Sequence, residues 1–167
     1  MELNGKVALV LGAIKGIGKE IGLSLANQGV KVALNYIDWE EELEGLKQDF
    51  AATGRPHLIL KTNLLKVEKT AGLIQRVIDH FGRLDILINN IERGGWPVVH
   101  GPYTPDQWDL EMETTLRAKR WIFDAALPYL EASGEGVVIN FSSIAAIVGR
   151  SGPAGMVFND GYAAANR

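Results

Sequence analysis

The chain has 167 residues, 47% of them hydrophobic and 22% charged, which is typical of one globular domain with a substantial core. A net charge of −3 and no cluster of lysines or arginines argue against a nucleic-acid-binding surface. The lack of cysteine excludes disulfides, thiolate metal sites and a cysteine nucleophile. No apolar run reaches the roughly 20 residues that span a bilayer, and residues 1–6 lack the features of a signal peptide. We therefore expect a cytoplasmic protein without a membrane segment.

A glycine-rich turn near the N-terminus connects a predicted strand, residues 6–11, to a predicted helix, residues 16–27. Its spacing, G-x-x-x-G-x-G, lets backbone N–H groups approach a pyrophosphate, and the helix N-terminus behind it favours negative charge. An ordinary glycine-containing turn is the alternative, but the strand before and the helix after it favour dinucleotide binding. The predicted cofactor contacts in this turn are Gly12, Ile14, Lys15, Gly16, Ile17 and Gly18.

Further along the chain, strand-length apolar segments alternate with segments of helical periodicity. The predicted strands are residues 30–36, 57–62, 84–88 and 137–141. The predicted helices are residues 39–52 with Asp38 as N-cap or first-turn acid, residues 66–81, residues 104–132 with a Thr104 capping box and a kink at Pro128, and a helix start at residues 161–167. Residues 91–103 and 144–160 are predicted loops. This alternation predicts an α/β fold, a doubly wound parallel sheet with helices on both faces.

Polar residues follow the predicted strands at their carboxyl ends, where ligands bind in such sheets. Asn89 and Asn90 follow the fourth strand, Ser142 and Ser143 follow the fifth, and the glycine turn follows the first. We therefore expect these segments to converge on one site. The three histidines are isolated and lack ligand spacing, so no metal site is predicted.

Taken together, these segments resemble the short-chain dehydrogenase/reductase family, NAD(P)-dependent oxidoreductases with a Rossmann fold, over essentially the whole chain. The resemblance implies that Asn89 and Asn90 line the cofactor. It implies that Ser143 orients the substrate oxygen, with neighbouring Ser142 as the structural alternative, and that Tyr162 exchanges the proton beside the cofactor. The motifs that carry it are the glycine turn, Asn89-Asn90, residues 139–143 and Tyr162-Ala163-Ala164-Ala165.

The sequence departs from the family at functional positions. Asn166 stands where the family has a lysine that holds the nicotinamide ribose and lowers the pKa of the tyrosine, and Thr115 stands where it has an asparagine. Glu92 replaces the glycine of the usual N-N-A-G segment. Lys119 lies one helical turn after Thr115 and is a candidate substitute charge, but a solvated surface lysine is the expected reading.

Either NADP or NAD is the implied cofactor, with NADP slightly favoured. Lys15 resembles the basic residue of members that bind the 2′-phosphate of NADP, and Tyr36 replaces the acid that selects NAD. Asp38 argues in the opposite direction. Asn63 is expected at the position that usually contacts adenine.

Residues 1–167 are predicted to form a single NAD(P)-binding domain, incomplete at its C-terminal end because the family usually continues beyond this point. The resemblance also implies a homo-oligomer for the complete protein. The favoured function is hydride transfer between NAD(P)(H) and a small-molecule carbonyl or secondary alcohol. The alternative is a non-catalytic dinucleotide-binding sensor or scaffold that kept the fold and lost the catalytic lysine. A flavodoxin-like binding domain is disfavoured by the glycine spacing together with the serine and tyrosine.

Overall fold

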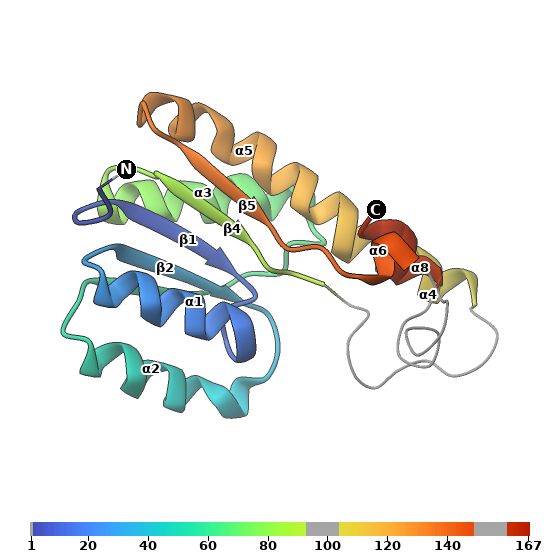
Figure 1. Cartoon of the computed structure of the whole chain (residues 1–167), viewed down its shortest axis with the longest axis horizontal. Coiled ribbons are helices and arrows are strands. Elements are labelled where there is room, and N and C mark those ends of the chain that lie inside the picture. The colour runs from blue at the N-terminus through green and yellow to red at the C-terminus, as the bar shows by residue number, and fades with distance from the viewer. Residues whose placement is uncertain (1, 93–103, 149–159) are drawn as a thin grey trace.

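The computed structural model describes residues 2–92, 104–148 and 160–167, and it contains a five-stranded parallel sheet in the order β3-β2-β1-β4-β5 (Figure 1). The predicted fold class is therefore confirmed. Each predicted strand is present, with ends that shift by no more than two residues. The strands are β1 Val7–Leu11, β2 Lys31–Tyr36, β3 His57–Lys61, β4 Ile86–Asn89 and β5 Val137–Asn140.

Helices cover both faces of the sheet (Figure 1). Helices α1 and α2 lie on one face, and α3 and α5 lie on the other. The shorter α4, α6 and α8 lie beyond the carboxyl ends of the strands, where α8 packs against α4 and α6. The helices are α1 Gly16–Asn27, α2 Leu43–Ala52, α3 Val67–Phe81, α4 Pro105–Glu111, α5 Ala118–Ala132, α6 Ala145–Val148 and α8 Asp160–Ala165.

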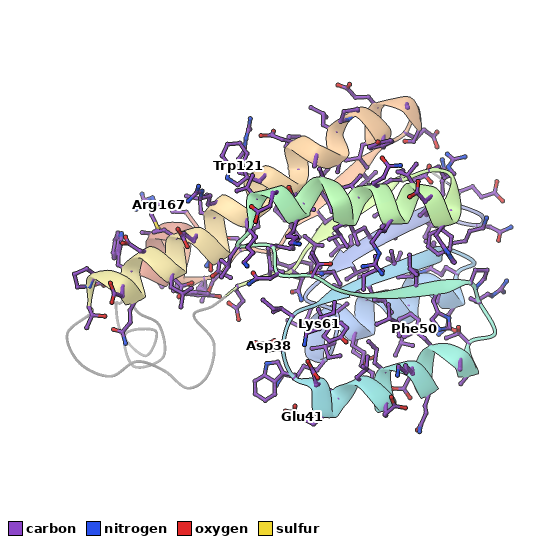
Figure 2. The ribbon with its side chains drawn as sticks, turned by 180° about the vertical axis from the view of Figure 1, so that it is seen from behind. Asp38, Glu41, Phe50, Lys61, Trp121 and Arg167 are labelled. Carbon is purple, nitrogen blue, oxygen red and sulfur yellow. The ribbon has the colours of Figure 1, made fainter. Side chains whose placement is uncertain are left out.

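Strand β1 lies at the centre of the sheet and separates two hydrophobic cores. Because side chains alternate along a strand, Leu9 packs into the core under α3 and α5, and Val10 packs into the core under α1 and α2. Phe50 points from α2 toward the sheet and is fully buried (Figure 2). Burial on both faces explains why β1 is continuously apolar. No helix in the described part of the chain is long and apolar enough to cross a membrane.

The predicted helix over residues 39–52, with Asp38 as its N-cap, is wrong at its start. Trp39 has a left-handed backbone, with φ of 60°, which an α-helix cannot continue through. A short 3₁₀ turn, Glu40–Glu42, follows, and α2 begins at Leu43. The chain thus makes a sharp turn directly after β2, at the edge where the candidate site lies.

The predicted long helix over residues 104–132 is interrupted. The Thr104 capping box is confirmed, since its hydroxyl accepts from the Gln107 N–H and the Gln107 side chain accepts from the Thr104 N–H. A π-helical segment, Met112–Arg117, separates α4 from α5, whereas Pro128, the predicted kink, lies inside α5. The predicted loop over residues 144–160 contains α6, and residues 93–103 and 149–159 of the two predicted loops lie outside the described residues.

Asp85 anchors the start of β1 at the amino end of the sheet, directly before β4. Its side chain is fully buried, accepts from the Val7 N–H at 2.9 Å, and accepts from Arg83 at 2.5 and 2.8 Å. Lys6 Nζ lies 3.5 Å from the same carboxylate. Burial opposes ionisation of Asp85, but the bonds from Arg83 and Val7 and the charges of Arg83 and Lys6 outweigh it and hold the pKa of Asp85 below its usual value.

We expect Asp85→Asn to lower the free energy of unfolding by about 2 kcal/mol at neutral pH, measured by urea denaturation, because it removes the charge of a buried, hydrogen-bonded group. A depressed folded-state pKa means that the carboxylate stabilises the fold fully above the unfolded pKa of about 3.9. The difference between variant and wild type should therefore shrink as pH falls through the folded-state pKa of Asp85. Glu135→Gln is the matched control, because Glu135 also pairs with Lys6 but is exposed. An equal loss of unfolding free energy in both variants would contradict the stabilising role of the buried Asp85.

Candidate functional site

A cavity of about 1270 Å³ lies at the carboxyl ends of the strands. Its walls come from the glycine turn, the segments after β2, β3, β4 and β5, and helices α4, α5 and α8. The parallel register brings Leu11, Asn89 and Asn140 to neighbouring positions at this edge. The lining includes Gly12, Ile14, Lys15, Gly16, Ile17, Tyr36, Asp38, Trp39, Asn63, Asn90, Glu92, Glu111, Lys119, Ser142, Tyr162 and Asn166.

The glycine turn is held against the end of β4 by close backbone packing. A Cβ at Gly12 would overlap the Asn90 carbonyl, and a Cβ at Gly18 would overlap the Gly12 carbonyl. Asn90 Nδ2 donates to the Gly12 carbonyl at 3.2 Å. At Gly16, φ is +57° and nothing lies within 4 Å of where a Cβ would be, so this residue faces open space in the cavity. Packing thus requires glycine at positions 12 and 18, and the left-handed backbone favours it at position 16.

Helix α1 starts at the cavity, where the backbone N–H groups of its first turn can bind an anion. Its N-cap residue Lys15 makes no side-chain capping bond, and its first turn has no acidic residue. The N–H groups of a first helical turn have no partner within the helix, and the helix dipole favours negative charge there. Gly16 and Ile17 of this turn line the cavity. These residues fit the pyrophosphate of a dinucleotide.

The segments that follow β2 and β3 form another part of the cavity wall. Tyr36 and Asn63 both line it, and Asn63 Oδ1 accepts from the Leu65 N–H at 3.0 Å, which fixes the turn after β3. Lys15 Nζ lies 2.7 Å from the centroid of the Trp39 ring, a cation–π contact. Figure 2 shows Asp38, two residues after β2, and Lys61, the last residue of β3, in the same region.

Asn89 and Asn90 differ in position. Asn90 lines the cavity, as described above. Asn89 is 1% exposed, and its Nδ2 donates to Asn140 Oδ1 at 2.6 Å, across β4 and β5. Its side chain therefore joins two strands and is not part of the cavity lining, which corrects the expectation that both asparagines line the cofactor.

Ser143 and Tyr162, which are 19 positions apart in the chain, meet at the end of β5. Their side chains are hydrogen-bonded, and Ser143 Oγ also accepts from the Ala145 N–H at 3.2 Å. The neighbouring Ser142 Oγ donates to the Asn166 carbonyl at 2.7 Å instead. Asn166 Nδ2 donates to the Tyr162 carbonyl at 3.0 Å. The two serines thus have different partners, and Ser143 is the one in contact with the tyrosine hydroxyl.

The surroundings of Tyr162 favour its protonated form. Its side chain is buried, and burial is the largest cause that raises its pKa above the usual value. A hydrogen bond to the Glu92 carboxylate raises the pKa further, as do the charges of Glu92 and Glu111. The hydrogen bond with Ser143 opposes these effects without overcoming them. Tyr162 is therefore held in its neutral form, with the proton on its hydroxyl.

Thr115 does not reach the cavity lining. It is 1% exposed, and its Oγ1 donates to Glu111 Oε1 at 2.6 Å. Glu111 itself is 2% exposed and does line the cavity. A π-helical segment such as the one that carries Thr115 is common near functional sites. Thr115 therefore contacts the carboxylate of Glu111, which lines the cavity.

Lys119 is not the solvated surface lysine that the sequence favoured. Its side chain is half-buried and lines the cavity, and its Nζ donates to the Phe141 carbonyl at 2.8 Å. Burial lowers the pKa of Lys119, and the charges of Glu92 and Glu111 oppose this. The expected reading is wrong because α5 approaches the end of β5 closely enough for a long side chain to reach its backbone.

Glu111 and Trp39 are site residues that the sequence reasoning missed. Glu111 lies four positions before Thr115, so helical spacing already placed the two on one face. The placement of Trp39 had no sequence signal, because its left-handed backbone is unusual for a residue with a large side chain. Within the described ranges, no group of three or more histidine, cysteine or acidic side chains is arranged to hold a metal ion.

Sequence comparisons identify relatives of this chain. The sequence profile of the short chain dehydrogenase family matches residues 6–158. A 3-oxoacyl-[acyl-carrier-protein] reductase of Staphylococcus aureus is 32% identical over 154 residues, which is 91% of this chain and 61% of that protein. A hydroxynaphthalene reductase-like protein of Metarhizium robertsii is 34% identical over 144 residues, which is 86% of this chain and 53% of that protein. The chain thus spans little more than half of the length of these relatives.

Solved structures with the same fold agree with the sequence relatives. A protein designated a short-chain alcohol dehydrogenase from Sinorhizobium meliloti superimposes with a TM-score of 0.85 at 28% identity, over 99% of this chain and 62% of that one. A metagenomic short-chain oxidoreductase in complex with NADP superimposes with a TM-score of 0.83 at 28% identity, over 99% of this chain and 72% of that one. With the profile match, the glycine turn and the serine–tyrosine contact, the chain belongs to the short-chain dehydrogenase family.

Proposed function

We propose that this protein is an NADPH-dependent reductase of a small-molecule carbonyl compound, with oxidation of the corresponding secondary alcohol as the reverse reaction. One observation carries the proposal: Tyr162 lines the cavity that also contains the glycine turn, and its hydroxyl is hydrogen-bonded to Ser143. A dinucleotide lying along this edge of the sheet would extend from the turn toward these hydroxyls. Two relatives named as reductases support the direction of the reaction.

In this proposal the hydroxyls of Ser143 and Tyr162 have different roles toward the substrate oxygen. When bound, the cofactor supplies the hydride that reduces the carbonyl carbon. Ser143 donates a hydrogen bond that orients the carbonyl oxygen, and Tyr162 gives its phenolic proton to that oxygen as the C–H bond forms. The products are the alcohol, the oxidised cofactor and a tyrosinate, which regains its proton from water. The raised pKa keeps Tyr162 in the protonated form that reduction requires, but it also makes the phenol a weaker acid.

The choice of NADPH over NADH rests on the side chains at the adenosine end of the cavity. Lys15 has its ammonium over the Trp39 ring and lines the cavity, where it suits a phosphate on the adenosine ribose. Tyr36 provides no carboxylate to repel that phosphate, although the exposed Asp38 lies two residues on. The neighbour solved with NADP supports the same choice.

A second candidate function is dinucleotide binding without turnover. Asn166 brings no charge to Tyr162, and the pKa of the tyrosine is raised rather than lowered. A sensor or scaffold would keep cofactor binding while showing no cofactor oxidation with a panel of β-keto thioesters, cyclic ketones and aldehydes. A large gain of turnover in Asn166→Lys would favour this candidate, whereas ordinary turnover by the wild type would rule it out.

We also propose self-association through the helical segment that includes α5. Leu116 is 50% exposed and Trp121 is 38% exposed, and Trp121 lies on the outer side of α5 (Figure 2). Apolar side chains of this size on a surface are typical of contacts between subunits.

Removal of the tyrosine hydroxyl tests the catalytic assignment. We expect Tyr162→Phe to lower kcat for carbonyl reduction by about 10³-fold, because the proton donor is lost, and Ser143→Ala to lower it by about 10²-fold. NADPH absorbance measures the rate. Tyr129→Phe and Ser133→Ala are matched controls, since these hydroxyls bond to Gln75 and Leu130 away from the cavity. Undiminished turnover in Tyr162→Phe would exclude the proposed mechanism.

Cofactor selectivity is tested at Lys15. We expect Lys15→Met to raise the Kd for NADPH by about tenfold and to change the Kd for NADH little, because only the former presents a phosphate to the ammonium. Fluorescence titration of the reduced cofactors measures both constants. Lys19→Met is the control, since Lys19 pairs with Asp49 on α2 and does not line the cavity. An equal effect on both cofactors would contradict the NADPH assignment.

Self-association is tested with Trp121→Glu. Light scattering across a range of protein concentrations should show an oligomer for the wild type and a smaller species for the variant, because a buried unpaired carboxylate is costly. Lys47→Glu on the exposed side of α2 is the control. A monomeric wild type at all concentrations would refute the proposal.

A further inference from the structure

Lys119 places an ammonium group at the carboxyl end of the sheet. It extends from the first turn of α5 and donates to the Phe141 carbonyl, which directly follows β5 and lies two residues before Ser143. An ammonium has three donors, and one hydrogen bond to Phe141 uses only one of them. The half-buried position strengthens its electrostatic effect on neighbours, since less water screens the charge.

The surrounding charges connect Lys119 to Tyr162. Lys119 and Tyr162 line the same cavity as Glu92, after β4, and Glu111, on α4, and these two carboxylates act on both groups. Helix α8 adds Asp160, which is exposed. Without a nearby cation, a phenolate at Tyr162 would face the charges of Glu92 and Glu111. Proton exchange at that hydroxyl would then be strongly disfavoured.

Two other residues, Lys15 and Asn166, were candidates to supply a positive charge near Tyr162, and neither does so. Lys15 lines the cavity at the glycine turn, with its ammonium over Trp39. Asn166, on the same helix as Tyr162, is neutral, and its amide donates to the Tyr162 carbonyl. Among the described residues that line the cavity, Lys119 is therefore the cation that shares its charged neighbours with Tyr162.

We propose that Lys119 supplies the positive charge that offsets Glu92 and Glu111, so that Tyr162 can release its proton to the substrate oxygen and take it up again. This proposal rests on the proposed function. Lys119 is a positioning residue in this scheme, because it acts on the substrate through the tyrosine. The charge comes from α5 and not from the position at which the sequence has Asn166.

The test compares variants at position 119 in the reverse reaction, alcohol oxidation with NADP⁺, where Tyr162 must lose its proton. Removing a nearby positive charge raises the pKa of the phenol by about one unit. Below that pKa the tyrosinate fraction falls with it, so Lys119→Met should lower kcat about tenfold at each pH and shift the pH profile toward alkaline values. The Kd for NADPH should stay unchanged. Lys47→Met is the control for loss of a lysine elsewhere.

Two further variants separate charge from structure. Lys119→Gln keeps a hydrogen-bond donor for the Phe141 carbonyl but no charge, and it should behave like Lys119→Met; Lys119→Arg should retain most of the rate. In the Lys119→Met background, Asn166→Lys should restore the rate by supplying a charge from α8. A wild-type rate and pH profile in Lys119→Gln would overturn the proposal, because the lysine would then matter only for its hydrogen bond to the Phe141 carbonyl.

A direct titration keeps this proposal separate from the proposed function. Tyrosine labelled with ¹³C at Cζ, assigned by the signal lost in Tyr162→Phe, reports the ionisation of Tyr162 by NMR. The comparison is made in the Glu92→Gln background, since loss of this carboxylate moves the titration to less alkaline pH. Lys119→Met should shift it upward by about one unit. An unchanged titration refutes the role of Lys119, whereas absent turnover with the expected shift refutes only the reductase assignment.

Discussion

The parallel pairing of β1, β4 and β5 is the constraint on which the rest of the site depends. It places Leu11, Asn89 and Asn140 in register, so that three segments from distant parts of the chain leave the sheet at one edge. Gly12 and Gly18 then pack against Asn90, and the Asn90 side-chain amide donates to the Gly12 carbonyl, which holds the first two of these segments together. A side chain at either glycine would push the turn away from β4. The cavity exists because this approach is close.

The sheet and the glycine turn were predictable because they depend on local patterns. A strand buried on both faces is continuously apolar, and a turn that needs left-handed backbone or close packing uses glycine. The Thr104 capping box is equally local, and the structure confirms it. The meeting of Ser143 with Tyr162 came from a family resemblance, because neither residue's spacing in the chain indicates the contact.

Other features of the site depend on long-range packing and could not be predicted. Trp39 takes a left-handed backbone although glycine is the usual residue there, and its ring lies under Lys15 from another segment. The role of Asn89 changed because its partner, Asn140, lies 51 positions away. Lys119 looked like a surface residue for the same reason: helical spacing gives its face on α5, but only the packing of that helix on β5 shows what the face meets.

Cofactor binding and proton chemistry are built from separate parts of this molecule. The glycine turn and the start of α1 offer backbone N–H groups, whose capacity for an anion does not depend on any ionisable side chain. At the tyrosine end, burial and the carboxylates of Glu92 and Glu111 favour the neutral phenol, and we propose that the ammonium of Lys119 offsets them. A substitution near Tyr162 can therefore alter turnover while the glycine turn still binds a dinucleotide. The fold of this family therefore does not by itself determine whether a chain with Asn166 is active, and under our proposal the charges that face Tyr162 decide it.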